Sequence, residues 1–166
     1  MAALDEQVVE EWLNRRGFFT IRGLKIGLRE IDLLAVKLNP DAQLECWHVE
    51  VTISFNPIGY IGGGNSAKLR SSTDVEDGVK DWVQKKFDEE AVVRRRDDLI
   101  RGAAWTRVLV HGRVKHPTEL PLFQRHGIKL IPYHIILEDL LKDRKSTSSS
   151  SASGIADIVR YMREIT

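Results

Sequence analysis

Apolar residues recur along the chain at spacings that change from helix to strand and back. The segment 5–16 repeats its apolar residues at helical spacing, which predicts an amphipathic helix, and Gly17 directly after it predicts the end of that helix. Three β-prone segments follow at 18–22, 30–38 and 44–54. Short turns at 23–27 and 39–41 separate them, so we expect an antiparallel meander.

The second half of the chain alternates between helical and strand patterns. A glycine-rich loop at 56–72 leads to Thr73-x-x-Glu76, a capping box that predicts a helix to about Phe87, continued by the charged stretch 88–101. A strand at 106–111 is apolar enough to be buried on both faces. A helix at 118–126, a strand at 128–131 and a helix at 134–142 complete the pattern. The order α-βββ-α-β-α-β-α predicts an α/β fold with a mixed sheet flanked by helices.

The C-terminal part of the chain has a different composition. Serine dominates 145–153, which predicts a flexible linker. An amphipathic helix is expected after it, with a stripe formed by Ile155, Ile158, Val159, Met162 and Ile165. This stripe packs either on its own domain or on a partner chain, for example a second copy. We therefore divide the chain into a domain at 1–144, a linker at 145–153 and a helix at 154–166.

Composition and charge narrow the classes of protein that fit. No apolar run approaches the roughly 20 residues of a membrane-spanning helix, and no basic-then-apolar leader is visible, so a cytoplasmic protein without a membrane partner is expected. The single cysteine excludes an internal disulfide and a multi-cysteine zinc site. With a net charge of +1, a nucleic-acid binder would depend on local basic groups. The candidates are Arg22, Lys25, Lys68 and Arg70, and the alternative is that they are ordinary solvated surface.

Two neighbouring predicted strands each carry an acidic residue among apolar ones. Asp32 lies in Glu-Ile-Asp-Leu-Leu-Ala, and Glu50 lies in Val-Glu-Val. Burying such a residue is costly unless it is paired or bound to a metal. Adjacent strands lie roughly 4.8 Å apart, so two carboxylates can converge on one ion. Together with the Val51 carbonyl and water, Asp32 and Glu50 would give the oxygen ligands that Mg²⁺ prefers, with Mn²⁺ as a substitute.

These motifs resemble the core of the PD-(D/E)XK nucleases, which have the restriction-endonuclease-like fold. The resemblance is nearest to the Holliday-junction resolvase-like members, and it covers roughly residues 4–142 in the order of elements. Those relatives also carry a glutamate on the first helix, eleven residues before a Gly-aromatic pair, and Glu6 precedes Gly17-Phe18 by that spacing. The resemblance implies a magnesium-dependent endonuclease, a hydrolase that cuts phosphodiester bonds of DNA.

One position departs from the family pattern. The family has a lysine two residues after the motif glutamate, and this chain has Thr52. A preorganised donor of this kind typically contributes about 10²–10³ in rate. Either a lysine arrives from elsewhere, with Lys80 as the first candidate and Lys68 as the second, or Thr52 itself contacts the scissile phosphate.

Three functions remain open at this point. The first is a DNA nuclease in which Asp32, Glu50, Thr52, Glu6 and Lys80 are the candidate catalytic residues. The second is an inactive module of the same fold that binds nucleic acid or a protein partner. The third is a structural subunit whose acids are merely salt-bridged, which predicts no metal affinity. A lysine ammonium beside the acid pair would favour the first function over the second.

Overall fold

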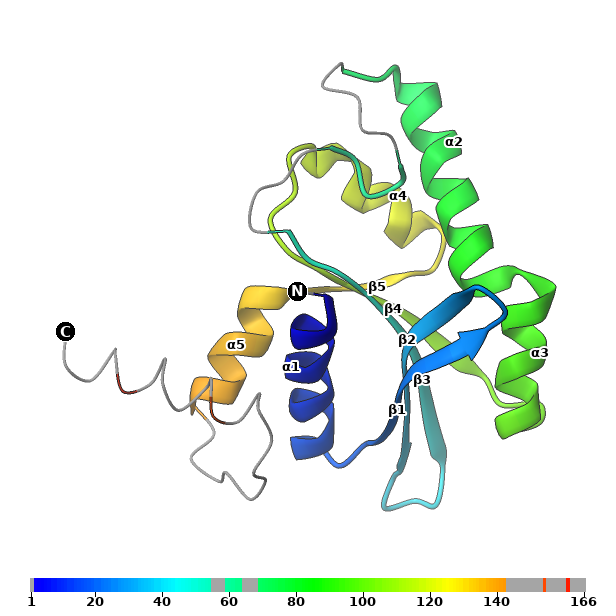
Figure 1. Cartoon of the computed structure of the whole chain (residues 1–166), viewed down its shortest axis with the longest axis vertical. Helices are drawn as coiled ribbons and strands as arrows, with labels where there is room; N and C mark the ends of the chain where they lie inside the picture. The colour runs from blue at the N-terminus through cyan, green and yellow to red at the C-terminus, as the bar shows by residue number, and fades with distance from the viewer. Residues whose placement is uncertain (1, 55–58, 64–68, 143–153, 155–160, 162–166) are drawn as a thin grey trace.

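A five-stranded mixed sheet forms the centre of the molecule in the computed structural model, which describes residues 2–54, 59–63, 69–142, 154 and 161 (Figure 1). The strands lie in the order β1-β2-β3-β4-β5. Their bounds are β1 Phe19–Ile26, β2 Arg29–Leu38, β3 Leu44–Thr52, β4 Trp105–His111 and β5 Lys129–Pro132. The first three strands are antiparallel, while β4 pairs in parallel with β3 and with β5. The predicted meander and mixed sheet are confirmed.

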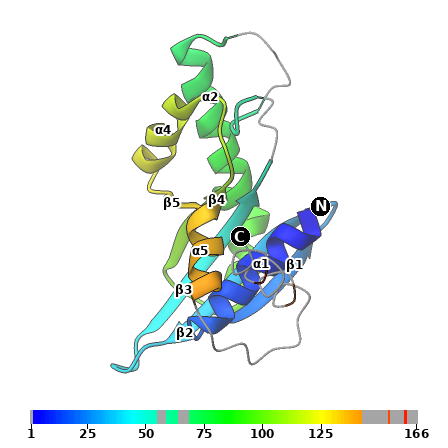
Figure 2. The same ribbon diagram turned by 90° about the vertical axis from the view of Figure 1, so that its left-hand side faces the viewer.

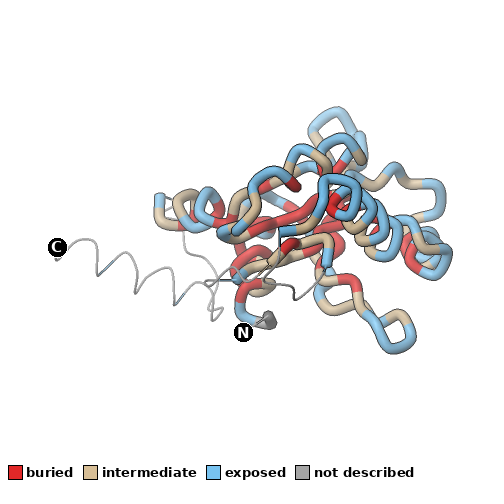
Figure 3. Tube along the Cα trace, turned by 90° about the horizontal axis from the view of Figure 1, so that it is seen from above, coloured by how far each residue is buried: buried red, intermediate tan, exposed pale blue. Residues whose placement is uncertain are grey.

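Helices cover both faces of this sheet, as the sequence pattern predicted. Their bounds are α1 Ala2–Arg15, α2 Ser72–Val83, η1 Gln84–Asp88, α3 Glu90–Leu99, η2 Pro117–Glu119, α4 Leu120–Arg125 and α5 Tyr133–Lys142. Figure 2 shows α1 and α5 together in front of the sheet, and α2 and α4 lie beyond it. Seen from above in Figure 3, the buried residues run between exposed outer layers.

The predicted end of the first helix is confirmed by its backbone bonds. Gly17 takes a positive φ of 85°, which is the left-handed conformation that glycine adopts most readily. The Gly17 N–H donates to Asn14 O at 3.0 Å, and the Phe18 N–H donates to Leu13 O at 3.1 Å. This is a Schellman motif, and it turns the chain from α1 into β1.

The face under α1 and α5 is an uninterrupted apolar core. Its cluster combines one side of β2, β3 and β4 with the inward residues of the two helices, and it contains Val8, Val9, Trp12, Leu13, Phe18, Leu33, Ala35, Trp47, Val49, Val108, Val110, Ile131, Tyr133, Ile136 and Leu140. The three apolar residues in the middle of β4 are fully buried, so the prediction that this strand is covered on both faces is confirmed.

Three local predictions need correction. Residues 23–26 continue β1 rather than forming a turn, and the hairpin turns at Gly27 and Leu28 after the pair Ile26–Arg29. The cap of α2 is Ser71, whose hydroxyl accepts the Asp74 N–H, so the helix begins two residues earlier than the Thr73 box predicted. The helix of the charged stretch 88–101 is separate, because residue 89 adopts extended backbone angles.

Two further predictions concern membrane-spanning segments and the C-terminal part of the chain. None of the helices within the described residues is long and apolar enough to cross a membrane. The linker at 145–153 and the helix with the stripe from Ile155 to Ile165 lie outside the described residues, apart from the isolated positions 154 and 161.

Candidate active site

The two predicted acids lie side by side where β2 and β3 part. Pairing between these strands runs from Leu38–Leu44 to Leu33–Val49, and Asp32 and Glu50 are the next residues on each strand. The Asp32 carboxylate replaces the missing backbone partner, because its Oδ2 accepts the Val51 N–H at 2.7 Å. Burial, and then the charge of Glu50, raises the pKa of the neighbouring Asp32 carboxyl. The structure therefore brings both acids to one point, on one side of the sheet.

Glu50 is enclosed by polar partners. Its side chain is 1% exposed. The Glu50 Oε1 lies 3.1 Å from His48 Nε2, and Oε2 forms an ion pair with the Lys86 ammonium, although it accepts no hydrogen bond of good geometry. Burial together with the Arg96 charge lowers the pKa of His48 well below its ordinary value, so the imidazole is neutral and its contact with Glu50 is a hydrogen bond.

Lys86 arrives from an unusual helical segment. Residues Gln84–Asp88 form one π-helical turn between α2 and α3, a feature that often marks functional sites. Phe87 in this turn is fully buried against the sheet, and Lys86 beside it reaches Glu50 with a third of its side chain still exposed. Burial by itself would lower the pKa of Lys86, but the Glu50 carboxylate outweighs it and raises that pKa, so the ammonium stays charged.

Negative charge exceeds positive charge in this cluster. Burial first, and then repulsion from Glu50, raises the pKa of Asp32 from 3.8 to about 7. Burial also raises the pKa of Glu50, which Lys86 only partly offsets. Glu6 on α1 has a raised pKa through burial and the nearby charge of Asp32. A proton or a cation at these carboxyl groups is favoured by the raised pKa of all three.

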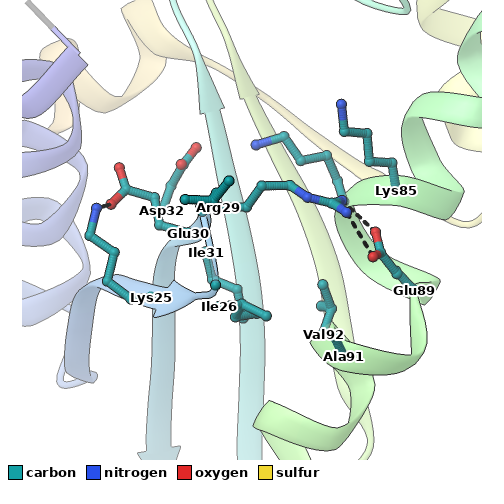
Figure 4. Close-up of a pocket in the computed structure, with 13 residues that line it drawn as sticks. Lys25, Ile26, Arg29, Glu30, Ile31, Asp32, Lys85, Glu89, Ala91 and Val92 are labelled. Atoms are coloured by element: carbon teal, nitrogen blue, oxygen red, sulfur yellow. Dashed lines mark hydrogen bonds and ion pairs between the residues drawn. The ribbon is translucent and has the colours of Figure 1, made fainter.

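A cleft of about 590 Å³ opens onto this cluster from the Asp32 side (Figure 4). Its walls are the β1–β2 hairpin and the segment from η1 to α3. Arg29 bridges these walls through a two-pronged ion pair with Glu89, at 2.7 Å for the Nη2–Oε1 bond. Lys85 and Lys86 line the same cleft as Asp32. The cleft thus carries Lys85 and Lys86 near Asp32, together with two ion pairs on its walls.

The predicted nucleic-acid contacts are spread over the surface rather than gathered in this cleft. Lys25 lines the cleft and pairs with Glu30. Arg22 forms an ion pair with Glu10 at 3.2 Å, and Arg70 donates to Gly63 O at 2.6 Å; neither lines the cleft. Lys68 lies outside the described residues.

The donor that contacts the acid pair is Lys86, which was not among the predicted donors. Thr52 is half-buried at the end of β3, two residues beyond Glu50, and Lys80 is exposed on α2. Lys86, six residues after Lys80, makes the contact with Glu50. The sequence did carry a signal for it, because Lys86 follows Trp82 and Val83 at helical spacing and so falls within the apolar stripe of its helix. His48, two residues before Glu50 on β3, also reaches the acid pair through its bond to Glu50.

A divalent cation fits the chemistry of the acid pair. Within residues 2–54, 59–63 and 69–142, no group of three or more His, Cys, Asp or Glu side chains is arranged to hold a metal ion. Two carboxylates, backbone oxygen and water suffice for Mg²⁺, which keeps much of its hydration shell in proteins. A cation between Asp32 and Glu50 would also relieve the repulsion that raises the pKa of Asp32. The Val51 group bound to Asp32 is its N–H, so the carbonyl assigned to the metal stays a prediction.

A loop segment is fastened beside this site by a buried acid. Glu119 is fully buried, and its two carboxylate oxygens accept the N–H groups of Ile61 at 2.8 Å and Gly62 at 3.2 Å. Gly62 lies against the backbone of Gly78 on α2, where a Cβ on Gly62 would meet the Gly78 carbonyl carbon at 2.9 Å. The segment 59–63 is therefore held to the helix that leads into the Lys86 turn.

Comparison with known proteins gives no match among family models, curated proteins or solved structures.

Proposed function

We propose that the chain is a divalent-metal-dependent nuclease of the PD-(D/E)XK type that hydrolyses phosphodiester bonds of DNA. The observation that carries this proposal is the convergence of Asp32, Glu50 and the Lys86 ammonium at the point where β2 and β3 part. Two carboxylates and one lysine are the charged groups of that catalytic site, and here the lysine comes from a helix instead of the strand position occupied by Thr52.

Each residue has a role that its surroundings support. Asp32 and Glu50 would hold Mg²⁺ or Mn²⁺. When bound, this ion would lower the pKa of a coordinated water and supply positive charge beside the phosphate. Burial and the nearby charge of Asp32 raise the pKa of Glu6 on α1, which suits a group that orients water and accepts its proton. Lys25, Arg29 and Lys85 on the cleft walls would contact neighbouring phosphates.

Lys86 supplies the donor that the sequence motif lacks. Its ammonium is charged and held by Glu50, and a third of its side chain is exposed. It can therefore donate to a non-bridging phosphate oxygen and stabilise the charge that develops during attack. Thr52 can add a neutral hydrogen bond at the end of β3.

Metal binding and cleavage test this proposal together. Calorimetry with Mn²⁺ and a plasmid-nicking assay would be run on the native chain, on Asp32→Asn and Glu50→Gln, and on Glu76→Gln as an exposed acidic control on α2. We expect nicking only with a divalent cation, and a loss of at least about 10³-fold in both site variants. Nicking by Asp32→Asn at the native rate would exclude the proposed site.

A second candidate is an inactive module of the same fold that binds nucleic acid. It is favoured by the enclosure of Glu50, which is 1% exposed and already bound by both His48 and Lys86. This module would retain DNA with the same affinity in the absence and presence of Mg²⁺, and no DNA form would be cut. Linear duplex, branched and single-stranded DNA and RNA should each be assayed, because the cleft does not select among them.

A further inference from the structure

We infer that Arg96 is a positioning residue, which lies outside the cleft and sets the distance between Glu50 and Lys86. This inference rests on the proposed function and adds a residue that never touches the cleft. Arg96 lies on α3 and is 8% exposed, although it carries a full charge. An arginine is rarely buried this far without specific partners.

The Arg96 guanidinium has two recorded partners, and each belongs to a different part of the site. Its Nη1 lies 3.1 Å from His48 Nδ1 on β3. Its Nη2 donates to the Phe87 carbonyl oxygen at 3.0 Å, in the π-helical turn. The planar guanidinium presents its donors in a fixed fork, so the strand and the turn are held at a set separation.

This contact fixes the protonation of His48. A guanidinium donates hydrogen bonds and accepts none, so His48 Nδ1 must be the acceptor. The imidazole proton is then on Nε2, which faces Glu50 Oε1 at 3.1 Å and donates to it. A chain of two hydrogen bonds therefore runs from Arg96 to His48 and from His48 to Oε1 of Glu50.

The second prong acts on the lysine. Phe87 follows Lys86 directly, and Lys86 forms its ion pair with the other oxygen of Glu50. One guanidinium thus holds the backbone beside the lysine and, through His48, the carboxylate that the lysine meets. Residues that orient a metal ligand typically contribute about 10- to 100-fold to metal affinity or activity.

The test compares Arg96→Met and His48→Phe with Arg94→Met, an exposed arginine of the same helix that pairs with Glu90. All assays are run at a temperature at which circular dichroism shows each variant folded. We expect both site variants to weaken Mn²⁺ binding and to lower kcat for nicking by about 10- to 100-fold. The KM for DNA should not change, because neither residue lines the cleft. The Arg94 variant should match the native chain.

Two further comparisons separate positioning from general support of the fold. His48→Gln places an amide donor near the position of Nε2, so it should retain more metal affinity than His48→Phe. The double variant of Arg96→Met with His48→Phe should lose less than the sum of the two single losses, because Arg96 acts partly through His48. Additive losses, or a measurable Mn²⁺ affinity that is equal in the native chain and in all variants, would overturn the inference.

A readout without metal distinguishes failure of this inference from failure of the proposed function. Nitrogen-15 NMR of the imidazole, assigned with His48→Gln, should show the proton on Nε2 in the native chain and a mixture of tautomers in Arg96→Met. If this change of tautomer is seen but the native chain binds no metal, the nuclease proposal is rejected and the positioning role of Arg96 is kept. A proton on Nδ1 in the native chain would reject the positioning role whatever the activity.

Discussion

Both faces of the sheet carry apolar clusters, but they differ along β3. Trp47 and Val49 enter the apolar core under α1 and α5, the apolar face, whereas His48 and Glu50, which alternate with them, face the opposite side and join a buried polar network there, on the polar face. The apolar face stabilises the fold through close packing. The polar face carries acids whose burial opposes ionisation. The polar face therefore adds an electrostatic cost beside apolar clusters of its own.

Removing the lysine of the polar face should have the largest effect. Lys86→Met should lower the nicking rate by about 10²- to 10³-fold, because it removes the preorganised donor at the phosphate. Lys80→Met and Lys85→Met are matched controls on the same helical stretch, and a single-turnover assay is the measurement. An equal loss in Lys80→Met would mean that the charge of the helix, and not the contact with Glu50, is what matters.

The apolar face should respond only in stability. Leu33 is fully buried in the cluster beneath α1, so Leu33→Ala should lower the free energy of unfolding by about 2–5 kcal/mol. Urea denaturation measures this loss. The Mn²⁺ affinity of the folded fraction should equal that of the native chain. A weakened metal site in this variant would show that the two faces are coupled, contrary to the comparison.

Asp32 should make stability depend on pH and on metal. Because its pKa is raised from 3.8 to about 7, protonation favours the folded state, so this contribution is complete below pH 3.8 and is lost as the pH rises through 7. Asp32→Asn should therefore unfold at a higher temperature than the native chain at pH 8 without metal, by a few degrees for each ~1 kcal/mol relieved.

The metal dependence provides the control for that experiment. At pH 8, Mn²⁺ should raise the unfolding temperature of the native chain and leave that of Asp32→Asn unchanged. At pH 4 the two proteins should unfold at similar temperatures, because Asp32 is protonated there. A native chain that is most stable at pH 8 without metal would contradict the charge imbalance in this site.

The smallest effect is expected at the walls of the cleft. Lys85 is exposed beside Lys86, and Lys85→Gln should weaken DNA binding by a few-fold without altering kcat. The salt dependence of log Kd should become shallower by about one phosphate contact. Fluorescence anisotropy at several salt concentrations measures both quantities. Arg70→Gln, which lies outside the cleft, should leave both as in the native chain.

The sequence predicted the strands and the acid pair because both follow from local patterns. A carboxylate in an apolar strand has few stable environments, so Asp32 and Glu50 were recognisable, and the period of two predicted the side of the sheet that Glu50 faces. The mixed sheet followed from the meander and the later βα units. The predicted strand ends were less accurate, because the turn expected at 23–27 includes residues 23–26, which lie within a paired strand.

The donor Lys86 and the buried Arg96 were harder to predict, because their places in the site depend on tertiary contacts. The extra residue of a π-helical turn shifts the helix register, and no local signal announces it. Lys80 was the first candidate, but Lys86 makes the contact with Glu50. Arg96 is one of three successive arginines, and only the packing of α3 on the sheet distinguishes the buried one from its exposed neighbour Arg94.

The anchored loop segment has a mechanical consequence. Glu119 holds the amides of Ile61 and Gly62, and Gly62 rests on Gly78 without room for a methyl group. Segment 59–63 therefore packs directly on helix α2, and we expect the two to move together. A ligand that displaces this stretch of loop should then also shift the helix, and with it the turn that presents Lys86.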